Sequence, residues 1–264
     1  MLANYHTHTY RCKHATGTDE EYILKAIAEG VKILGFSDHA PFIYPDGYVS
    51  YYKMTPQEAG EYFASLSALR DKYADKIEIH IGYEAEYYPE LWERTVAFWK
   101  NENTPEYLIL GQHYISEEYA TVGNVHSYSG TDDPMILKKY VDLIVEGLST
   151  KRFTYLAHPD VVSFRGSPED YEREMTRLMT EVTKLNIPIE LNLLGISEGR
   201  NYPTDAFWRI ASKFSPRVIL GCDAHDPESV ADRSDVTKAL KYADKFSLNV
   251  IESLPLINPF PEIV

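Results

Sequence analysis

The sequence predicts an α/β fold in which a parallel β-sheet is covered by α-helices. Short apolar runs alternate with longer amphipathic segments seven times along the chain. The apolar runs are bounded by polar or turn residues, as expected of parallel strands that are buried on both faces. Most of the amphipathic segments begin with a proline, which favours the first turn of a helix. Such alternation fits either an open doubly wound sheet or a closed barrel, and the periodicity does not distinguish them.

Seven strands and seven helices are therefore expected within one domain, residues 1–264, because the chain shows no repeat, low-complexity tract or linker. The first helix follows Thr18 and Glu21, which have the spacing of a capping box. The predicted strands lie near residues 2–9, 33–38, 77–84, 107–113, 153–158, 187–193 and 217–223. The predicted helices are 22–31, 56–73, 89–100, 134–148, 168–185, 204–214 and 227–246.

The composition argues against several classes of partner. The net charge is −14, with 40 acidic residues against 26 Lys and Arg, and there is no basic run. Nucleic acid and anionic membranes are therefore poor partners. No apolar stretch approaches the roughly 20 residues that a membrane-spanning helix needs, and the first residues do not resemble a signal peptide. A soluble, cytoplasmic protein is expected, and its oligomeric state is left open.

The histidines are concentrated where the predicted strands end. Six of the nine histidines lie at or just beyond the carboxyl end of a strand: His6, His8, His39, His113, His158 and His225. His14 lies in the loop after the first strand, and the carboxylates Glu84 and Asp223 also end strands. The carboxyl ends of parallel strands meet at one edge, so residues that are distant in sequence would gather there.

The spacing within these motifs suits metal binding. Residues i and i+2 of a strand face the same side, roughly 6–7 Å apart, so His6 and His8 can converge on one cation. Asp223 and His225 repeat this arrangement at the last strand. The two pairs would face each other if the sheet closes into a barrel. A single histidine would be better explained as a surface or core residue, but six at equivalent strand ends favour a metal cluster.

The ordered set of motifs resembles the polymerase-and-histidinol-phosphatase (PHP) superfamily, and most closely its stand-alone histidinol-phosphate phosphatases. The opening pattern His-x-His-x-x-x-Cys-x-His, from His6 to His14, and the closing Gly-x-Asp-Ala-His are similar to theirs. The motifs are His6-Thr7-His8, Ser37-Asp38-His39-Ala40, Gly82-Tyr83-Glu84, Gly111-Gln112-His113-Tyr114, Ala157-His158-Pro159 and Gly221-Cys222-Asp223-Ala224-His225. The resemblance implies a distorted seven-stranded (β/α)7 TIM-like barrel.

The resemblance also implies a centre of three divalent metal ions, for which zinc, manganese or iron are suitable. The implied ligands are His6, His8, Glu84 and Asp223 for the first ion, Glu84, His113 and His158 for the second, and His14, His39 and His225 for the third. Glu84 would bridge the first two ions. A hydroxide activated by the metals would then attack phosphorus, and Asp223 or His225 would help to protonate the leaving oxygen.

Substrate contacts are predicted in the loops that follow the strands. Arg11, Arg165 and Arg200 are candidates for binding phosphate, because an arginine fork suits phosphate oxygens. For each of them an exposed surface arginine is an equally good interpretation. Acidic and aromatic contacts to the imidazole and ammonium groups of histidinol phosphate could come from Asp160, Glu86 or the loop 44–52.

Some chemically capable residues are expected to be structural. His80 is predicted to be packed in the core, and His126 to be exposed rather than a ligand, although it could line the pocket. Cys12 and Cys222 are interpreted as buried small residues. Asp38, which lies beside His39 in the sequence, is expected to orient the imidazole of a metal ligand.

The predicted function is hydrolysis of L-histidinol phosphate to L-histidinol and phosphate, in histidine biosynthesis. Three alternatives remain: a phosphatase for other phosphomonoesters, a phosphodiesterase or exonuclease with the same metals, and an inactive PHP-like binding module. The acidic charge argues against a nuclease. An inactive module should lack ligands, whereas every ligand position of the motifs is filled.

Overall fold

The computed structural model describes residues 1–101, 103–116, 118–119 and 125–262. Its centre is one parallel sheet of eight strands whose order in space follows their order in the chain. The strands are β1 Ala3–Asn4, β2 Ile33–His39, β3 Glu78–Ala85, β4 Leu108–Leu110, β5 Tyr155–Leu156, β6 Ile189–Asn192, β7 Arg217–Gly221 and β8 Asn249–Ile251. All seven pairs of neighbouring strands are parallel, which confirms the predicted α/β class.

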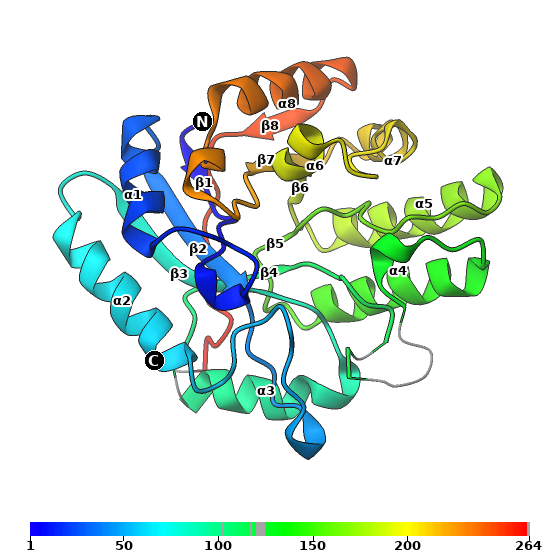
Figure 1. Ribbon diagram of the computed structural model, residues 1–264. Coiled ribbons are helices and arrows are strands. Elements are labelled where there is room, and N and C mark those ends of the chain that lie inside the picture. The colour runs from blue at the N-terminus through cyan, green and yellow to red at the C-terminus, as the bar shows by residue number, and fades with distance from the viewer. Residues whose placement is uncertain (102, 117, 120–124, 263–264) are drawn as a thin grey trace.

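The helices surround this sheet, as Figure 1 shows. They are α1 Asp19–Ala28, α2 Ala59–Lys72, α3 Pro89–Asn101, α4 Pro134–Ser149, α5 Pro168–Lys184, α6 Leu193–Glu198, α7 Asp205–Ala211 and α8 Arg233–Lys245. The capping box of α1 is present, since Thr18 and Glu21 each accept the backbone N–H of the other. Proline occupies the first position of α3, α4 and α5, as predicted. No helix among the described residues is long and apolar enough to cross a membrane.

The helix α2 begins at Ala59 rather than at the predicted Pro56. Three further elements differ from the sequence prediction. The sheet has eight strands rather than seven, because the short segment β8 adds to the edge of β7. The helix α6 begins directly at the end of β6, where the Asn192 side chain caps it at Gly195; its leucines looked like a continuation of the strand. The expected helix 227–246 is divided into a 3-10 turn, Pro227–Ser229, and α8.

The sheet curls until its first and seventh strands meet near their carboxyl ends. Thr7 and Ala224 form an isolated parallel bridge. The His8 N–H donates to the Ala224 carbonyl at 2.9 Å, and the Ala224 N–H donates to the His6 carbonyl at 3.3 Å. This closure places the His6–His8 segment beside the Asp223–His225 segment, as the barrel interpretation requires.

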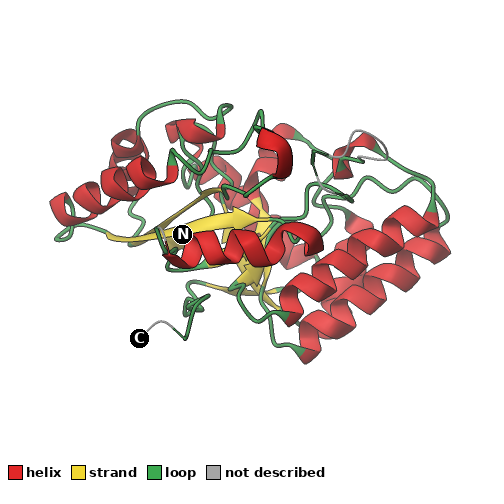
Figure 2. Cartoon of the chain, turned by 90° about the horizontal axis from the view of Figure 1, so that it is seen from below, coloured by secondary structure: helices red, strands yellow, loops and turns green. Residues whose placement is uncertain are grey.

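Two apolar layers support this arrangement. The larger layer packs the outer face of the sheet against the helices, which flank the strands in Figure 2. The smaller layer fills the inside of the curl with residues that include Tyr5, Tyr107 and Tyr155. Leu254, from the chain after β8, closes this layer, and its carbonyl accepts a hydrogen bond from Tyr5 Oη at 3.3 Å. These side chains fill the inside of the curl below the strand ends.

Candidate metal centre

The curled sheet brings all nine predicted metal ligands to its carboxyl edge. The centre of each of the seven histidine rings lies within 5.2 Å of another ring centre in the cluster. The tightest pair is His8 and His225, at 4.1 Å, which come from the two segments joined by the Thr7–Ala224 bridge. His113 and His158, which follow β4 and β5, lie 4.9 Å apart.

Glu84, near the end of β3, lies between two groups of histidines. Its Oε2 is 3.5 Å from Nε2 of His6, 3.5 Å from Nε2 of His8 and 3.1 Å from Nδ1 of His39. Its Oε1 is 2.8 Å from Nε2 of His158 and 3.6 Å from Nε2 of His113. The two oxygens of one carboxylate therefore face different nitrogen sets, which is the arrangement required of a bridging ligand.

Asp223 completes the first group from the opposite side of the closure. Its Oδ1 lies 3.4 Å from Nε2 of His6 and 3.1 Å from Nε2 of His8. The backbone φ is +50° at Asp223 and +25° at His158, a region that side-chain-bearing residues rarely adopt. Such backbone strain is concentrated at functional sites, where the surrounding fold holds a side chain in one direction.

Several polar atoms in the cluster are buried without a hydrogen-bond partner in the described part of the chain. They are His6 Nε2, His8 Nε2, His39 Nδ1, Glu84 Oε2, His158 Nδ1 and His225 Nε2. A buried polar group without a partner is costly, and a native fold normally supplies one. Ring nitrogens and carboxylate oxygens gathered in one place are ligands for divalent cations. The donor set therefore fits a metal centre.

Compact sets of ligand atoms can be identified within the cluster. The sets whose ligand atoms lie within 4.8 Å of one another include His6–His8–Asp223, His6–Glu84–His158, His8–His39–His225 and Cys12–His14–His225. The first set matches three of the four ligands that the sequence motifs implied for one ion. Cys12, interpreted from sequence as structural, is a free buried thiol that lies close enough to join His14 and His225.

The second nitrogen of several rings is held by a further acceptor. His6 Nδ1 lies 2.8 Å from Glu190 Oε1, and His113 Nδ1 lies 3.1 Å from Glu86 Oε1. Such contacts fix which nitrogen is free to bind a metal. Sequence reasoning missed Glu190, although a charged residue within an otherwise apolar buried strand is a detectable signal. Glu190 is fully buried.

Asp38 contacts the imidazole of a predicted ligand, as expected, and that ligand is His8. Its Oδ1 lies 3.3 Å from Nδ1 of His8 and accepts the backbone N–H of His39 at 2.8 Å. The imidazole of His39, the neighbour of Asp38 in the sequence, turns its Nδ1 towards Glu84 instead.

The electrostatics keep the carboxylates ionised. Burial disfavours the charged form of Glu84, but the histidines around it hold its pKa well below the usual range. Asp223 behaves in the same way. Burial lowers the pKa of His8, but the neighbouring carboxylates of Asp223 and Asp38 outweigh burial and raise it to about 9. A cation bound there would displace the proton of that ring.

Two glycines allow the buried carboxylates to fit. A Cβ atom at Gly111 would lie 1.9 Å from Glu84 Oε1, and one at Gly221 would lie 1.7 Å from Glu190 Oε1. Neither distance is compatible with a side chain. Both glycines belong to the sequence motifs, and the structure gives the reason: the carboxylates cross directly over these backbone positions.

The cluster opens into a cavity of about 340 Å³. Arg200 is the one predicted phosphate-binding arginine among its lining residues; its Nη1 donates to Tyr128 Oη at 3.1 Å and its Nε donates to Glu198 at 2.8 Å. The other lining residues are His14, His39, Tyr52, His113, His126, Tyr128, Leu194, Glu198, Asp223, His225 and Asp226.

The other two arginines are placed elsewhere. Arg11 is 2% exposed, and its two terminal nitrogens donate to Asp19 at 2.9 Å while Nε donates to Glu61 at 2.6 Å. Its donors are occupied by carboxylates, so the structure does not support a phosphate contact there. Arg165 is exposed and packs over Gly130 away from the cavity lining.

The histidines outside the ligand set also differ from expectation. His126 lines the cavity and is partly buried rather than exposed; its ring stacks on Tyr128 with 4.7 Å between the centres. His80 is not packed in the core. Its side chain is 23% exposed near the amino end of β3, where it contacts Glu106 at 2.9 Å and Glu78 at 2.8 Å.

The proposed specificity residues are largely committed to other contacts. Asp160 is buried and accepts hydrogen bonds from the backbone N–H and hydroxyl of Thr204. Burial raises its pKa to about 6. Glu86 contacts Lys53 and His113. Neither acid lines the cavity, whereas Tyr52 of the loop 44–52 does.

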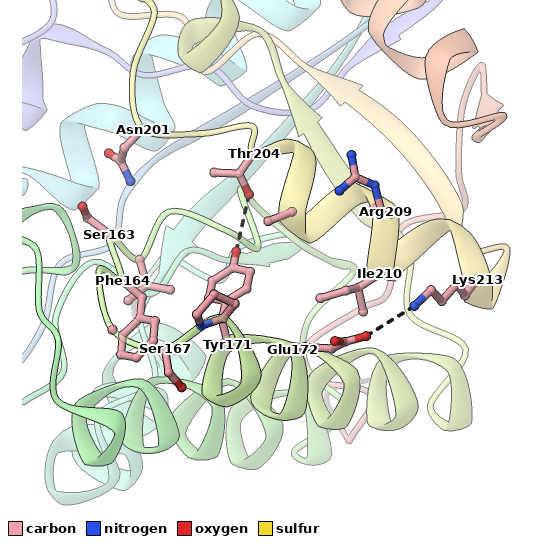
Figure 3. Close-up of a pocket in the computed structure, with 14 residues that line it drawn as sticks. Ser163, Phe164, Ser167, Tyr171, Glu172, Asn201, Thr204, Arg209, Ile210 and Lys213 are labelled. Carbon is pink, nitrogen blue, oxygen red and sulfur yellow. Dashed lines mark hydrogen bonds and ion pairs between the residues drawn. The ribbon is translucent and has the colours of Figure 1, made fainter.

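A second cavity of about 490 Å³ lies between α5 and α7. Figure 3 shows Tyr171 directed towards Thr204, and Glu172 paired with Lys213 at one end. None of the nine predicted ligands lines this cavity. It is larger than the cavity at the strand ends, but its lining residues in the described part of the chain include no histidine and only one carboxylate, that of Glu172, which is paired with Lys213.

Comparison with known families agrees with this geometry. The family model described as the PHP domain matches residues 4–193, which is more than half of the chain. The chain belongs to the PHP family. The PHP match includes the predicted ligands from His6 to His158 and ends before Asp223 and His225. The fold supplies that pair through the closure at Ala224.

Individual relatives of this PHP chain are phosphatases by name. A Deinococcus radiodurans protein named probable histidinol-phosphatase is 26% identical over 91% of the chain and 93% of its own length. Histidinol phosphate phosphatase from Lactococcus lactis, solved with zinc, L-histidinol and phosphate, superposes with a TM-score of 0.70 at 16% identity, covering 98% and 97% of the two chains. This likeness shows that the PHP barrel of the chain has the same fold as that enzyme.

Proposed function

We propose that this chain is a metal-dependent phosphatase that hydrolyses L-histidinol phosphate to L-histidinol and phosphate, a step of histidine biosynthesis. The observation that carries the proposal is the position of Glu84, whose two oxygens face separate histidine groups beside a cavity lined by Arg200. The Deinococcus and Lactococcus relatives support the choice of substrate.

The proposed ligands are the nine residues implied by the motifs: His6, His8, His14, His39, Glu84, His113, His158, Asp223 and His225. Bound zinc, manganese or iron ions, three in the proposed centre, would lower the pKa of water and offset the charge of the phosphoryl oxygens. Glu84 would set the spacing between two ions. Arg200 would bind a phosphate oxygen, and Asp223 or His225 would help to pass a proton to the leaving oxygen.

Recognition of the rest of the substrate is proposed to come from the cavity rim. Histidinol carries an ammonium group and an imidazole. Glu198 and Asp226 are acidic lining residues that can attract the ammonium group, and Tyr52, Tyr128 and His126 offer aromatic surface for the imidazole. The structure thus replaces Asp160 and Glu86 as candidates with residues that line the cavity.

The test compares substrates on one preparation of purified protein. Histidinol phosphate, a panel of other phosphomonoesters and single-stranded DNA should be assayed together with the metal content by mass spectrometry. We expect three ions per chain and the highest kcat/KM for histidinol phosphate. Equal or higher kcat/KM on another monoester would refute the assigned substrate, and cleavage of DNA alone would refute the monoesterase assignment.

A broader phosphatase specificity is the second candidate. It is favoured by a Clostridium acetobutylicum relative named only as a probable phosphatase, 24% identical over 92% of the chain. The exposed positions of Glu198 and Arg200 at the rim would permit it. Substitution of Glu198 by Gln separates the two candidates: a specific enzyme should lose kcat/KM for histidinol phosphate alone, and a broad phosphatase should change little on any monoester.

A further inference from the structure

Lys53 is a buried cation next to the metal-ligand cluster. Its side chain has no exposed surface, although it carries a charge. Its Nζ lies 2.5 Å from Glu86 Oε1 and 3.2 Å from Glu118 Oε2. The ring of Tyr52 lies 5.1 Å from the same nitrogen, within the range of a cation–π contact. Burying three charged groups costs free energy of folding. A role of this group in the neighbouring site would account for that cost.

Glu86 connects Lys53 to the cluster. The same oxygen, Oε1, accepts from the Lys53 ammonium and lies 3.1 Å from Nδ1 of His113. Since Nδ1 is engaged in this way, Nε2 of His113 is the nitrogen that faces Glu84, at 3.6 Å. A carboxylate that accepts from two donors is held in one rotamer, and the ring that it contacts is held with it.

The other contacts of Lys53 anchor it to the loop that precedes it. Glu118, its second carboxylate, accepts hydrogen bonds from Tyr44 Oη at 2.7 Å and from Tyr48 Oη at 3.2 Å. Tyr52 stacks on Tyr114 with 5.7 Å between the ring centres. The ammonium is therefore fixed from two sides, which makes Lys53 a rigid reference point for Glu86.

We propose that Lys53 is a positioning residue of the metal centre, which acts through Glu86 to hold the His113 ring with Nε2 directed at the second ion. This inference rests on the proposed metal-dependent function. It assigns Lys53 a role beyond that of an ion pair that only supports the fold. The expected consequence is a specific weakening of one metal site when Lys53 or Glu86 is changed, of about 10- to 100-fold, as for other outer partners of metal ligands.

The experiment measures metal affinity in a double-mutant cycle. Lys53→Met, Glu86→Gln and the double variant are titrated with zinc against a chromogenic chelator, starting from metal-free protein. We expect Glu86→Gln to lose 10- to 100-fold in affinity at one site. The double variant removes one charge of each sign. Its zinc affinity should equal that of Glu86→Gln, because Lys53 acts through the Glu86 carboxylate. Phosphatase activity is measured on the same variants. At limiting zinc their kcat should be lower than that of the wild type, and excess zinc should restore it.

The matched control is Lys138→Met, which removes a lysine from the surface ion pair with Asp142 on α4 and should keep zinc affinity within threefold of the wild type. Lys53→Met combined with Glu118→Gln keeps the charge balanced if Lys53→Met alone does not fold, and it should still show the weakened site. Wild-type affinity at every site in that variant would overturn the inference while leaving the proposed function intact. A wild-type protein without bound metal or phosphatase activity would overturn both.

Discussion

The most direct perturbation of the site is Gly111→Ala, which displaces the Glu84 carboxylate and leaves every predicted ligand residue unsubstituted. The new Cβ would lie 1.9 Å from Glu84 Oε1, 2.7 Å from its Cδ and 3.0 Å from its Cγ. Because a carbon–oxygen contact needs about 3.3 Å, the carboxylate oxygen must move by roughly 1.4 Å. The Gly111 backbone itself is not in the left-handed region, so this displacement is the main effect.

The magnitude follows from the role of Glu84 between two histidine groups. A misplacement of about 1 Å can cost about 100-fold in rate, so kcat/KM on histidinol phosphate should fall by about that factor. Overpacking should also reduce the free energy of unfolding by about 1–3 kcal/mol. Metal content, kcat/KM and urea unfolding of the purified variant measure these effects separately.

Gly60→Ala is the matched control, since Gly60 lies on the exposed face of α2 and its new Cβ would meet nothing closer than 3.9 Å. It should keep wild-type activity and gain up to about 1 kcal/mol from better helix propensity. If Gly111→Ala retained wild-type metal content and kcat/KM within threefold, the position of Glu84 would not control the reaction, and the reasoning would be refuted.

Three further outcomes are expected. Arg200→Ala should raise KM for histidinol phosphate about 10-fold or more, because one charge-assisted hydrogen bond to the phosphate is lost, and it should leave the metal content unchanged. An unchanged KM would show that Arg200 does not contact the substrate. Arg11→Ala leaves the buried Asp19 without its partner and should lower the free energy of unfolding by about 3–5 kcal/mol in denaturant titrations; an unaltered midpoint would contradict this. Asp160 has a folded-state pKa of about 6, above its unfolded value, so its stabilising contribution is present at low pH and is lost as pH rises through 6. Between pH 4 and pH 7, the free energy of unfolding of Asp160→Asn should therefore rise relative to that of the wild type by about 2–3 kcal/mol. If the difference between the two proteins did not change with pH, Asp160 would not titrate as expected.

Much of the fold and of the candidate site could be predicted because both depend on local patterns. Alternating apolar runs and proline starts identify parallel strands and their crossovers, and parallel strands place their carboxyl ends at one edge. His6, His39, Glu84 and His158 therefore had to approach one another once each was recognised as a strand-end residue. The short strand β8 and helix α6 were missed because three to six residues carry too little periodicity.

Tertiary structure decided the contacts between side chains that lie far apart in the sequence and belong to no common local pattern. Nothing in the sequence around Arg11, Arg165 and Arg200 separates them, yet one is paired with Asp19, one packs over Gly130 and one lines the cavity. Sequence alone determined which donors meet at the strand ends, since the period of a strand sets that. The tertiary fold determined which carboxylate each charge meets, because loop paths and long-range packing, rather than neighbouring residues, set those distances.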